Sequence, residues 1–369
     1  MTSGFNCIDG VAAAAPVLAG YGALPIGVRT RHLVNPDQID LTRADLPRHD
    51  RALTVEHWYP ATKATPPGGH YDTLLRDGAT PVRLTGRAAR NAEAAEGSFP
   101  LVVLLHGYPG NRMLMGHLGE TLASRGFQVA SIDHTDSTYQ DQGAFISTLF
   151  NRPLDTRFVA DAFNADAYAI IGYSMGGYGA LVSAGAGVAV QALANEPSAA
   201  AAAVWSAHCR PQVDPRLKAI MPIGAWGRQR GMWDAAGLAS LQVPMLLMAG
   251  SADAVSGYDD GMRLIFTEAT RSARHLLTFA GAGHNAAAPY PAPREAFSPS
   301  ATLAFLPAEH YADARWDTVQ MNGIAQHFAA AFLGLHLQGK TAMAGYLTAD
   351  LAGFQPGTTA GLRLESLRA

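Results

Sequence analysis

Ser174 stands in a Gly-x-Ser-x-Gly segment whose surroundings suit a nucleophilic serine. The segment runs from Gly172 to Gly176, follows the apolar residues 168–171 and precedes a run of small residues. This pattern predicts a buried strand, a tight turn and the start of a helix, with the serine hydroxyl raised above the edge of a sheet. In so tight a turn, side chains at Gly172 and Gly176 would collide with neighbouring backbone, and the serine would be held in a strained conformation. The chemistry to expect is nucleophilic attack by the Ser174 hydroxyl.

A serine hydroxyl needs a base within hydrogen-bond reach and an acid that orients that base. Asp253 follows the apolar residues 244–249, and His284 follows residues 276–279 and a Gly-rich turn. Both come just after predicted strands, at the edge where open α/β sheets meet their ligands. The order serine, acid, histidine along the chain is that of the α/β-hydrolase fold. We expect Asp253 to orient His284, and His284 to take the Ser174 proton and return it to the leaving group.

Other acids and histidines are weaker candidates for these roles. The rival acids either begin a helix or precede the serine, against the usual order of this fold: Asp259, Asp260, Asp133 and Asp136. The rival histidines lie in a polar segment, on a predicted helix and at a strand end, where structural roles are commoner: His310, His327 and His106.

An oxyanion hole is predicted from two backbone N–H groups. In this fold one comes from the loop after an early strand and the other from the residue after the nucleophile. The loop His106-Gly107-Tyr108-Pro109 follows the apolar residues 101–105, and Met175 follows Ser174. We assign the two N–H groups to Tyr108 and Met175, because Pro109 has no N–H.

These residues resemble those of two serine-hydrolase families. His106-Gly107, residues 122–134 and the His57-Trp58-Tyr59-Pro60 run look like the platelet-activating-factor acetylhydrolase and predicted dienelactone hydrolase group, over residues 27–285. One departure is that the Leu-Asp-Ala-Trp run, which carries the acid of the acetylhydrolases, corresponds here to residues 223–226, with Gly224 in place of aspartate. The acid must then come from elsewhere, and Asp253 can supply it. The cysteine nucleophile of true dienelactone hydrolases is likewise absent, since Ser174 fills that position.

The second resemblance is to cutinase-like polyester hydrolases. They also combine an aromatic residue in the first oxyanion loop with Ser-Met-Gly-Gly at the turn, as do Tyr108 and residues 174–177. They place a tryptophan beside the substrate where Trp226 stands, although structural packing would explain Trp226 almost as well. The resemblance implies an ester hydrolase with an aromatic-lined acyl pocket, acting on apolar or aromatic small esters, with polyester fragments as one option. A phospholipid esterase, an amidase or acyltransferase, and a non-catalytic binding protein of the same fold remain alternatives.

The elements that must position these residues alternate between strands and helices. Apolar runs at residues 101–105, 128–132, 168–173, 219–223, 244–249 and 276–279 predict strands, and residues 113–125 and 316–335 predict helices. Residues 27–34 and 53–59 alternate in polarity and predict an antiparallel pair. We therefore predict a single α/β-hydrolase domain with a doubly wound, mostly parallel sheet and antiparallel opening strands.

Five segments fall outside this pattern. Residues 1–25 are expected to form an N-terminal arm, and residues 61–97, rich in Pro, Gly, Arg and Ala, a surface excursion. The Ala-rich residues 188–203 predict partial helix interrupted at Pro197. Residues 286–315 form a long loop that either contributes to the pocket rim or is a solvated insertion, and residues 336–369 a C-terminal extension.

Composition narrows the function further. The chain has 369 residues, 48% hydrophobic composition, a net charge of −3 and only 15% charged residues. No basic stripe and no apolar run of membrane-spanning length is present, so we expect a small-molecule ester as partner, without nucleic acid or stable membrane insertion. No metal-ligand spacing appears, and we expect no cofactor. Cys7 and Cys209 are expected to be free, and the N-terminus lacks a cationic leader region, which favours a cytoplasmic location unless a leader was removed.

Overall fold

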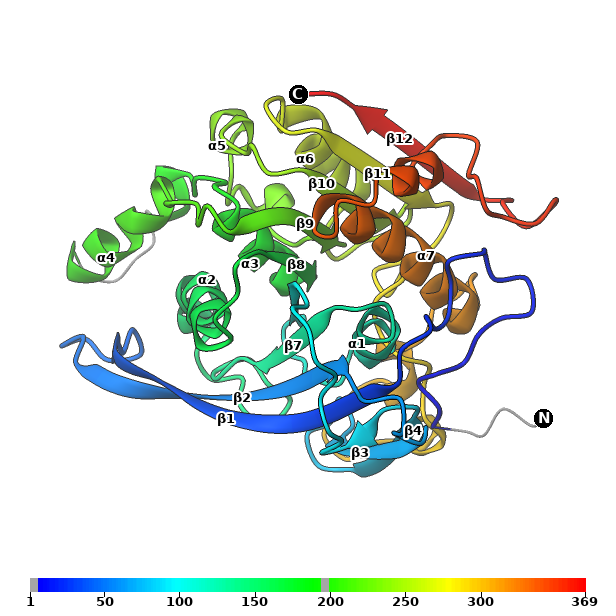
Figure 1. Cartoon of the computed structure of the whole chain (residues 1–369). Coiled ribbons are helices and arrows are strands. Elements are labelled where there is room, and N and C mark those ends of the chain that lie inside the picture. The colour runs from blue at the N-terminus through cyan, green and yellow to red at the C-terminus, as the bar shows by residue number, and fades with distance from the viewer. Residues whose placement is uncertain (1–5, 194–198) are drawn as a thin grey trace.

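The computed structural model describes residues 6–193 and 199–369, whose strands form two sheets (Figure 1). The larger has ten described strands in the order β12-β11-β10-β9-β8-β6-β7-β2-β1-β5, and β3 and β4 pair separately. The strands are β1 (Ile26–Ile39), β2 (Arg48–Pro60), β3 (Gly69–Leu74), β4 (Pro81–Gly86), β5 (Ala89–Arg90), β6 (Leu101–Leu105), β7 (Gln128–Asp133), β8 (Tyr168–Tyr173), β9 (Leu217–Ile223), β10 (Met245–Gly250), β11 (Arg274–Phe279) and β12 (Leu362–Leu367). The α-helices are α1 (Gly116–Ala123), α2 (Phe145–Ala162), α3 (Met175–Ser183), α4 (Ala199–Cys209), α5 (Ala235–Ala239), α6 (Arg263–Glu268) and α7 (Thr318–His336).

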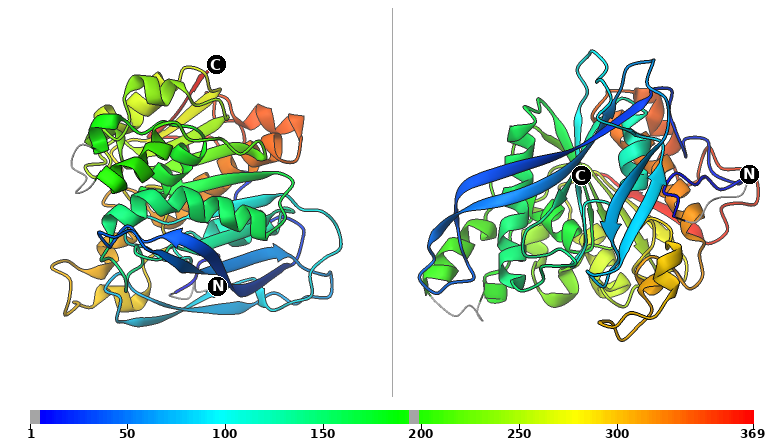
Figure 2. Two further views of the ribbon diagram at one scale, coloured as in Figure 1. Left: turned by 90° about the vertical axis from the view of Figure 1, so that its left-hand side faces the viewer. Right: turned by 90° about the horizontal axis from the view of Figure 1, so that it is seen from below.

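The central strands β6 to β11 run parallel to one another. The opening strands β1 and β2 pair antiparallel, and β2 joins the sheet antiparallel to β7. Figure 2 shows β1 and β2 as a long twisted ribbon. This confirms the prediction of a mostly parallel sheet with antiparallel opening strands, although both opening strands are longer than predicted.

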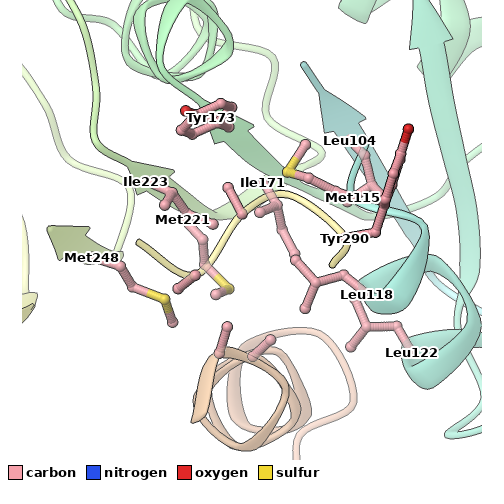
Figure 3. Close-up of a cluster of buried hydrophobic side chains, with 14 of the residues drawn as sticks. Leu104, Met115, Leu118, Leu122, Ile171, Tyr173, Met221, Ile223, Met248 and Tyr290 are labelled. Atoms are coloured by element: carbon pink, nitrogen blue, oxygen red, sulfur yellow. The ribbon is translucent and has the colours of Figure 1, made fainter. Parts of the chain in front are cut away.

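Helices cover both faces of the sheet, as a doubly wound architecture requires. Along β6, Val102 and Leu104 belong to the hydrophobic cluster that includes residues of α1 and α7. The other three residues of β6 belong to the cluster that includes residues of α2 and α3. Figure 1 shows the two helix pairs on opposite sides of the sheet, and Figure 3 shows Leu118 of α1 and Ile171 of β8 in the same cluster. Successive strand side chains point to opposite faces, so a strand buried on both faces has the continuous apolar sequence observed in β6.

Residues 61–97, expected to form a surface excursion, contain regular structure that was not predicted. This stretch contains the antiparallel pair β3 and β4, in which Tyr71, Val82 and Leu84 are buried. The alternation of Val82 and Leu84 with polar residues was the sequence signal for a strand.

The C-terminal extension also contains regular structure. Its strand β12 pairs antiparallel with β11 at the edge of the large sheet. Helix α4 accounts for the end of the Ala-rich stretch, while the predicted interruption at Pro197 lies outside the described residues.

Some further features bear on function. Cys7 and Cys209 are free. Across residues 6–193 and 199–369 there is no group of three or more His, Cys, Asp or Glu side chains that could hold a metal ion. Within the same residues, no helix has both the length and the apolar character to cross a membrane.

The parallel strands bring four chain segments to one edge of the sheet. The carboxyl ends of β6, β8, β10 and β11 lead directly into the loops that hold His106, Ser174, Asp253 and His284. Because neighbouring parallel strands end at the same edge, side chains from distant parts of the sequence can meet there.

Candidate active site

The turn between β8 and α3 holds Ser174 in a conformation that L-residues rarely adopt. Its φ is 54° and its ψ is −114°. A Cβ on Gly172 would lie 2.1 Å from the carbonyl oxygen of Gly176, and a Cβ on Gly176 would lie 1.9 Å from that of Leu105. Both glycines are therefore required by the close approach of backbone to backbone, for the steric reason predicted from the sequence.

Ser174, His284 and Asp253 form one hydrogen-bonded chain. The distance from His284 Nε2 to Ser174 Oγ is 2.9 Å, and that from His284 Nδ1 to Asp253 Oδ2 is also 2.9 Å. A carboxylate can only accept, so Nδ1 carries the proton and Nε2 is free to accept from the serine hydroxyl. Ser174 is 8% exposed and the side chain of His284 is 16% exposed. This geometry can transfer the hydroxyl proton to the imidazole as the serine attacks.

The loop after β10 holds the Asp253 carboxylate in one orientation. Its Oδ1 accepts hydrogen bonds from the backbone N–H groups of Val255, at 2.8 Å, and Ser256, at 3.0 Å. Burial by itself would raise the pKa of Asp253, but the hydrogen bonds from His284 and from these two amides lower it below its ordinary value. Asp253 is therefore an anion whose second oxygen is directed to His284.

Tyr173, labelled among the clustered side chains in Figure 3, supports the histidine loop. Its ring lies 5.1 Å from that of His284, and its hydroxyl donates to Asn285 Oδ1 at 2.9 Å. Asn285 Nδ2 in turn donates to the carbonyl oxygens of Glu309 and Ala312. The long segment 286–315 is thus tied to the loop that carries His284.

The two predicted oxyanion donors belong to chain segments that border Ser174. Met175 begins α3, so its N–H has no partner within the helix. A Cβ on Gly107 would lie 3.3 Å from Ser174 Cβ, so the peptide that leads into Tyr108 borders the serine. Among the described residues, neither the Tyr108 N–H nor the Met175 N–H has a hydrogen-bond partner. Two free N–H groups beside a nucleophile can bind a developing oxyanion.

Three aromatic rings, those of Tyr108, Phe145 and Trp226, lie in a row of contacts that ends near the backbone of Ser174. Trp226 donates its backbone N–H to the carbonyl oxygen of Ser174 at 3.1 Å. The Phe145 ring, at the start of α2, lies 5.6 Å from Trp226 and 5.3 Å from Tyr108 in edge-to-face contacts. Phe145 is 41% exposed, so the three rings form a partly open apolar surface.

Gly224, which stands where the acetylhydrolases carry their catalytic aspartate, faces the Asp253–His284 pair. A Cβ on Gly224 would lie 3.4 Å from both Asp253 Oδ2 and His284 Nδ1. An acid at position 224 would approach the same imidazole from β9. With Gly224 here, the carboxylate that meets the histidine comes from the next strand, β10.

Most of the rival acids and histidines have other partners. Asp133 pairs with Arg112, Asp136 pairs with Arg51, and Asp259 and Asp260 lie in the π-helix Tyr258–Met262. His310 lies 2.9 Å from the Tyr139 hydroxyl, and His327 Nδ1 accepts from the backbone N–H of Leu18. His106 bonds the backbone of its own loop.

Sequence reasoning missed three residues of this site. Tyr173 and Asn285 reach each other across 112 positions of sequence, and Phe145 is the first residue of α2. The adjacency of Tyr173 to Ser174 and of Asn285 to His284 was the only available signal, and it does not specify a contact.

Comparison with known proteins bears on the fold. A family model described as the alpha/beta hydrolase fold matches residues 100–207. Among solved structures, the chain is similar to a ferulic acid esterase from Streptomyces cinnamoneus, with a TM-score of 0.64 and 19% sequence identity over 99% of this chain and 100% of that one. Comparison with curated protein sequences finds no match. The chain has the α/β-hydrolase fold, as predicted.

Proposed function

We propose that this protein is a carboxylic ester hydrolase that works through an acyl-enzyme on Ser174. As Ser174 Oγ attacks the ester carbonyl, His284 Nε2 takes its proton, and Asp253 stabilises the imidazolium that forms. His284 then protonates the leaving alcohol as the ester C–O bond breaks. Water attacks the acyl-enzyme with His284 again as base, which releases the acid and restores the serine. These steps require no cofactor.

The observation that carries this proposal is the hydrogen-bonded chain from Ser174 through His284 to Asp253, with both contacts at 2.9 Å. A strained serine is costly unless the surrounding structure holds it, and such strain is concentrated at functional sites. The N–H groups of Tyr108 and Met175 are proposed to bind the oxyanion of the tetrahedral intermediate. The esterase named among the similar structures agrees with this reaction class, although a shared fold does not determine a substrate.

The proposed substrate is a small ester with an apolar or aromatic group. Tyr108, Phe145 and Trp226 support this proposal, because their rings offer edge and face contacts to a flat group placed beside Ser174.

The first test is labelling with a fluorophosphonate probe, followed by intact-mass measurement, peptide mapping and turnover of a p-nitrophenyl ester series. We expect one adduct on Ser174, ester turnover in the wild type, and neither in Ser174→Ala. Turnover that persists in purified Ser174→Ala would refute the proposal. Folded wild-type protein that forms no adduct and cleaves no ester would instead favour a binding protein of the same fold.

A further inference from the structure

Arg152 of α2 is a buried arginine for which the proposed reaction has no direct use. It is 0% exposed. One terminal nitrogen donates to the carbonyl oxygen of His106, and the other donates to that of Gly107 at 2.9 Å and to Ser137 Oγ at 2.8 Å. No ion pair of Arg152 occurs among the described residues, and the buried carboxylate of Asp155 pairs with Arg51 and His134 instead.

A buried guanidinium without an acid partner is costly, so its position calls for an explanation. Burial, with a smaller contribution from Arg51, lowers the pKa of Arg152 to about 9, although the nearby Asp155 carboxylate opposes this shift. Arg152 is therefore still a cation at neutral pH. All three groups that accept its hydrogen bonds are uncharged, and two of them are carbonyls of the loop that leads to Tyr108.

The geometry of one peptide links Arg152 to the proposed oxyanion hole. The carbonyl of Gly107 and the N–H of Tyr108 belong to the same peptide, which is trans. In a trans peptide these two groups point in opposite directions. A donor that holds the carbonyl on the side of α2 therefore directs the N–H away from α2. Gly107 borders Ser174, because a Cβ built on Gly107 would lie 3.3 Å from Ser174 Cβ.

His106 holds the same carbonyl from a second direction. Its Nδ1 lies 2.7 Å from Gly107 O and must donate to it, and its Nε2 accepts the backbone N–H of His134 at 3.2 Å. Burial, together with Arg152 and His134, lowers the pKa of His106 well below its ordinary value, which fits this neutral tautomer. The loop is thus held by a neutral ring and by a cation.

We propose that Arg152 is a positioning residue for the oxyanion hole: its bonds to His106 O and Gly107 O orient the Tyr108 N–H toward the oxyanion on the Ser174 adduct. The cation also polarises the peptide, which strengthens its N–H as a donor. Arg152 touches neither substrate nor reacting atoms. This inference rests on the proposed esterase function.

The expected signature is a loss of kcat without a matching rise in KM. An oxyanion exists only in the transition state and the tetrahedral intermediate, so a misdirected donor should leave ground-state binding almost unchanged. Complete loss of one donor costs about 10²–10³-fold in kcat. We expect Arg152→Gln to lower kcat by about 10- to 100-fold. The loss is smaller than for a missing donor because the peptide is displaced rather than removed, and His106 still holds the Gly107 carbonyl. Arg152→Lys, which keeps the charge but not the fork of donors, should fall between this variant and the wild type.

Arg274 offers a matched control. It is 5% exposed and, like Arg152, donates to main-chain carbonyls, in its case those of Phe266, Ser272 and Arg368. It lies at the amino end of β11, away from the site. Arg274→Gln should lower thermal stability to a similar extent and leave kcat within about twofold of the wild type.

The test measures kcat and KM on a p-nitrophenyl ester with active sites titrated, and inhibition by an aryl trifluoromethyl ketone, which adds to the serine and presents an oxyanion. Arg152→Gln should weaken this inhibitor by about the same factor as it lowers kcat, with KM within about twofold. If Arg152→Gln does not fold, the same comparison is made with Arg152→Lys. Unchanged kcat, or losses that match those of Arg274→Gln, would overturn the inference while wild-type turnover still supported the proposed function. Failure of the wild type to cleave any ester would refute the proposed function itself.

Discussion

Replacing Asp253 by asparagine should remove almost all turnover while preserving the fold. Oδ1 accepts from the N–H groups of Val255 and Ser256, at 2.8 and 3.0 Å. In asparagine only the oxygen can accept, so it will stay with these two donors. The amide nitrogen then takes the position of Oδ2, which now lies 2.9 Å from His284 Nδ1.

The consequence is a change of tautomer at His284. An amide N–H facing Nδ1 makes that nitrogen an acceptor, so the ring proton moves to Nε2. A protonated Nε2 cannot accept the Ser174 proton, and the base is lost even though all side chains stay in place. In a serine hydrolase this tautomer error costs about 10⁴-fold in kcat. That factor corresponds to about 5 kcal/mol in activation free energy.

The assay is kcat on a p-nitrophenyl ester, with circular dichroism as the check on folding. Asp234→Asn is a suitable control, because Asp234 also accepts a backbone N–H, that of Gly237, but caps α5 away from the histidine. We expect its kcat to stay within about twofold of the wild type. If folded Asp253→Asn kept more than about a tenth of wild-type kcat, the tautomer argument would be refuted and another acid would have to orient the base.

Two further predictions concern the aromatic surface and acid stability. Trp226→Ala and Phe145→Ala should each lower the ratio of kcat/KM for an aromatic ester to kcat/KM for a short aliphatic ester by about two- to tenfold. Because each variant is compared with itself on two substrates, a loss of folded protein does not change this ratio. An unchanged ratio would show that these rings do not contact the substrate. His117 is buried, its Nε2 lies 3.0 Å from Ala288 O, and burial lowers its pKa to about 4. Between pH 6.5 and 4 the unfolded chain binds a proton at this histidine that the folded chain does not. Lowering the pH across this range should therefore decrease the free energy of unfolding, and His117 alone should account for about 3 kcal/mol of the decrease. Urea unfolding across this range should show a weaker pH dependence in His117→Gln, and an identical dependence in the two proteins would contradict the assignment.

Local patterns in the sequence determine the parallel strands, the turn and the fold class. Continuous apolar runs predict strands covered on both faces, and residues 101–105 match β6 at both ends. The glycines at positions 172 and 176 predict the steric demand of the turn, because the collision that they avoid lies within a few residues of the serine and in the strand beside it. The sequence also predicts Ser174, Asp253 and His284 as a set, because their assignment depends only on where the strands end and on the order of the residues along the chain.

Only the tertiary structure decides which buried polar groups meet. Arg152 lies 45 positions from Gly107, and nothing in its neighbourhood along the chain distinguishes it from an arginine on a solvated helix face. Likewise, the contact of Phe145 with both Tyr108 and Trp226 depends on where α2 begins against two loops from other strands. The strand β12 was missed because its place at the sheet edge comes from pairing with β11, about 90 residues earlier. Periodicity reports only which face of an element is buried, whereas a hydrogen bond between distant segments depends on the packing of the whole sheet and its helices.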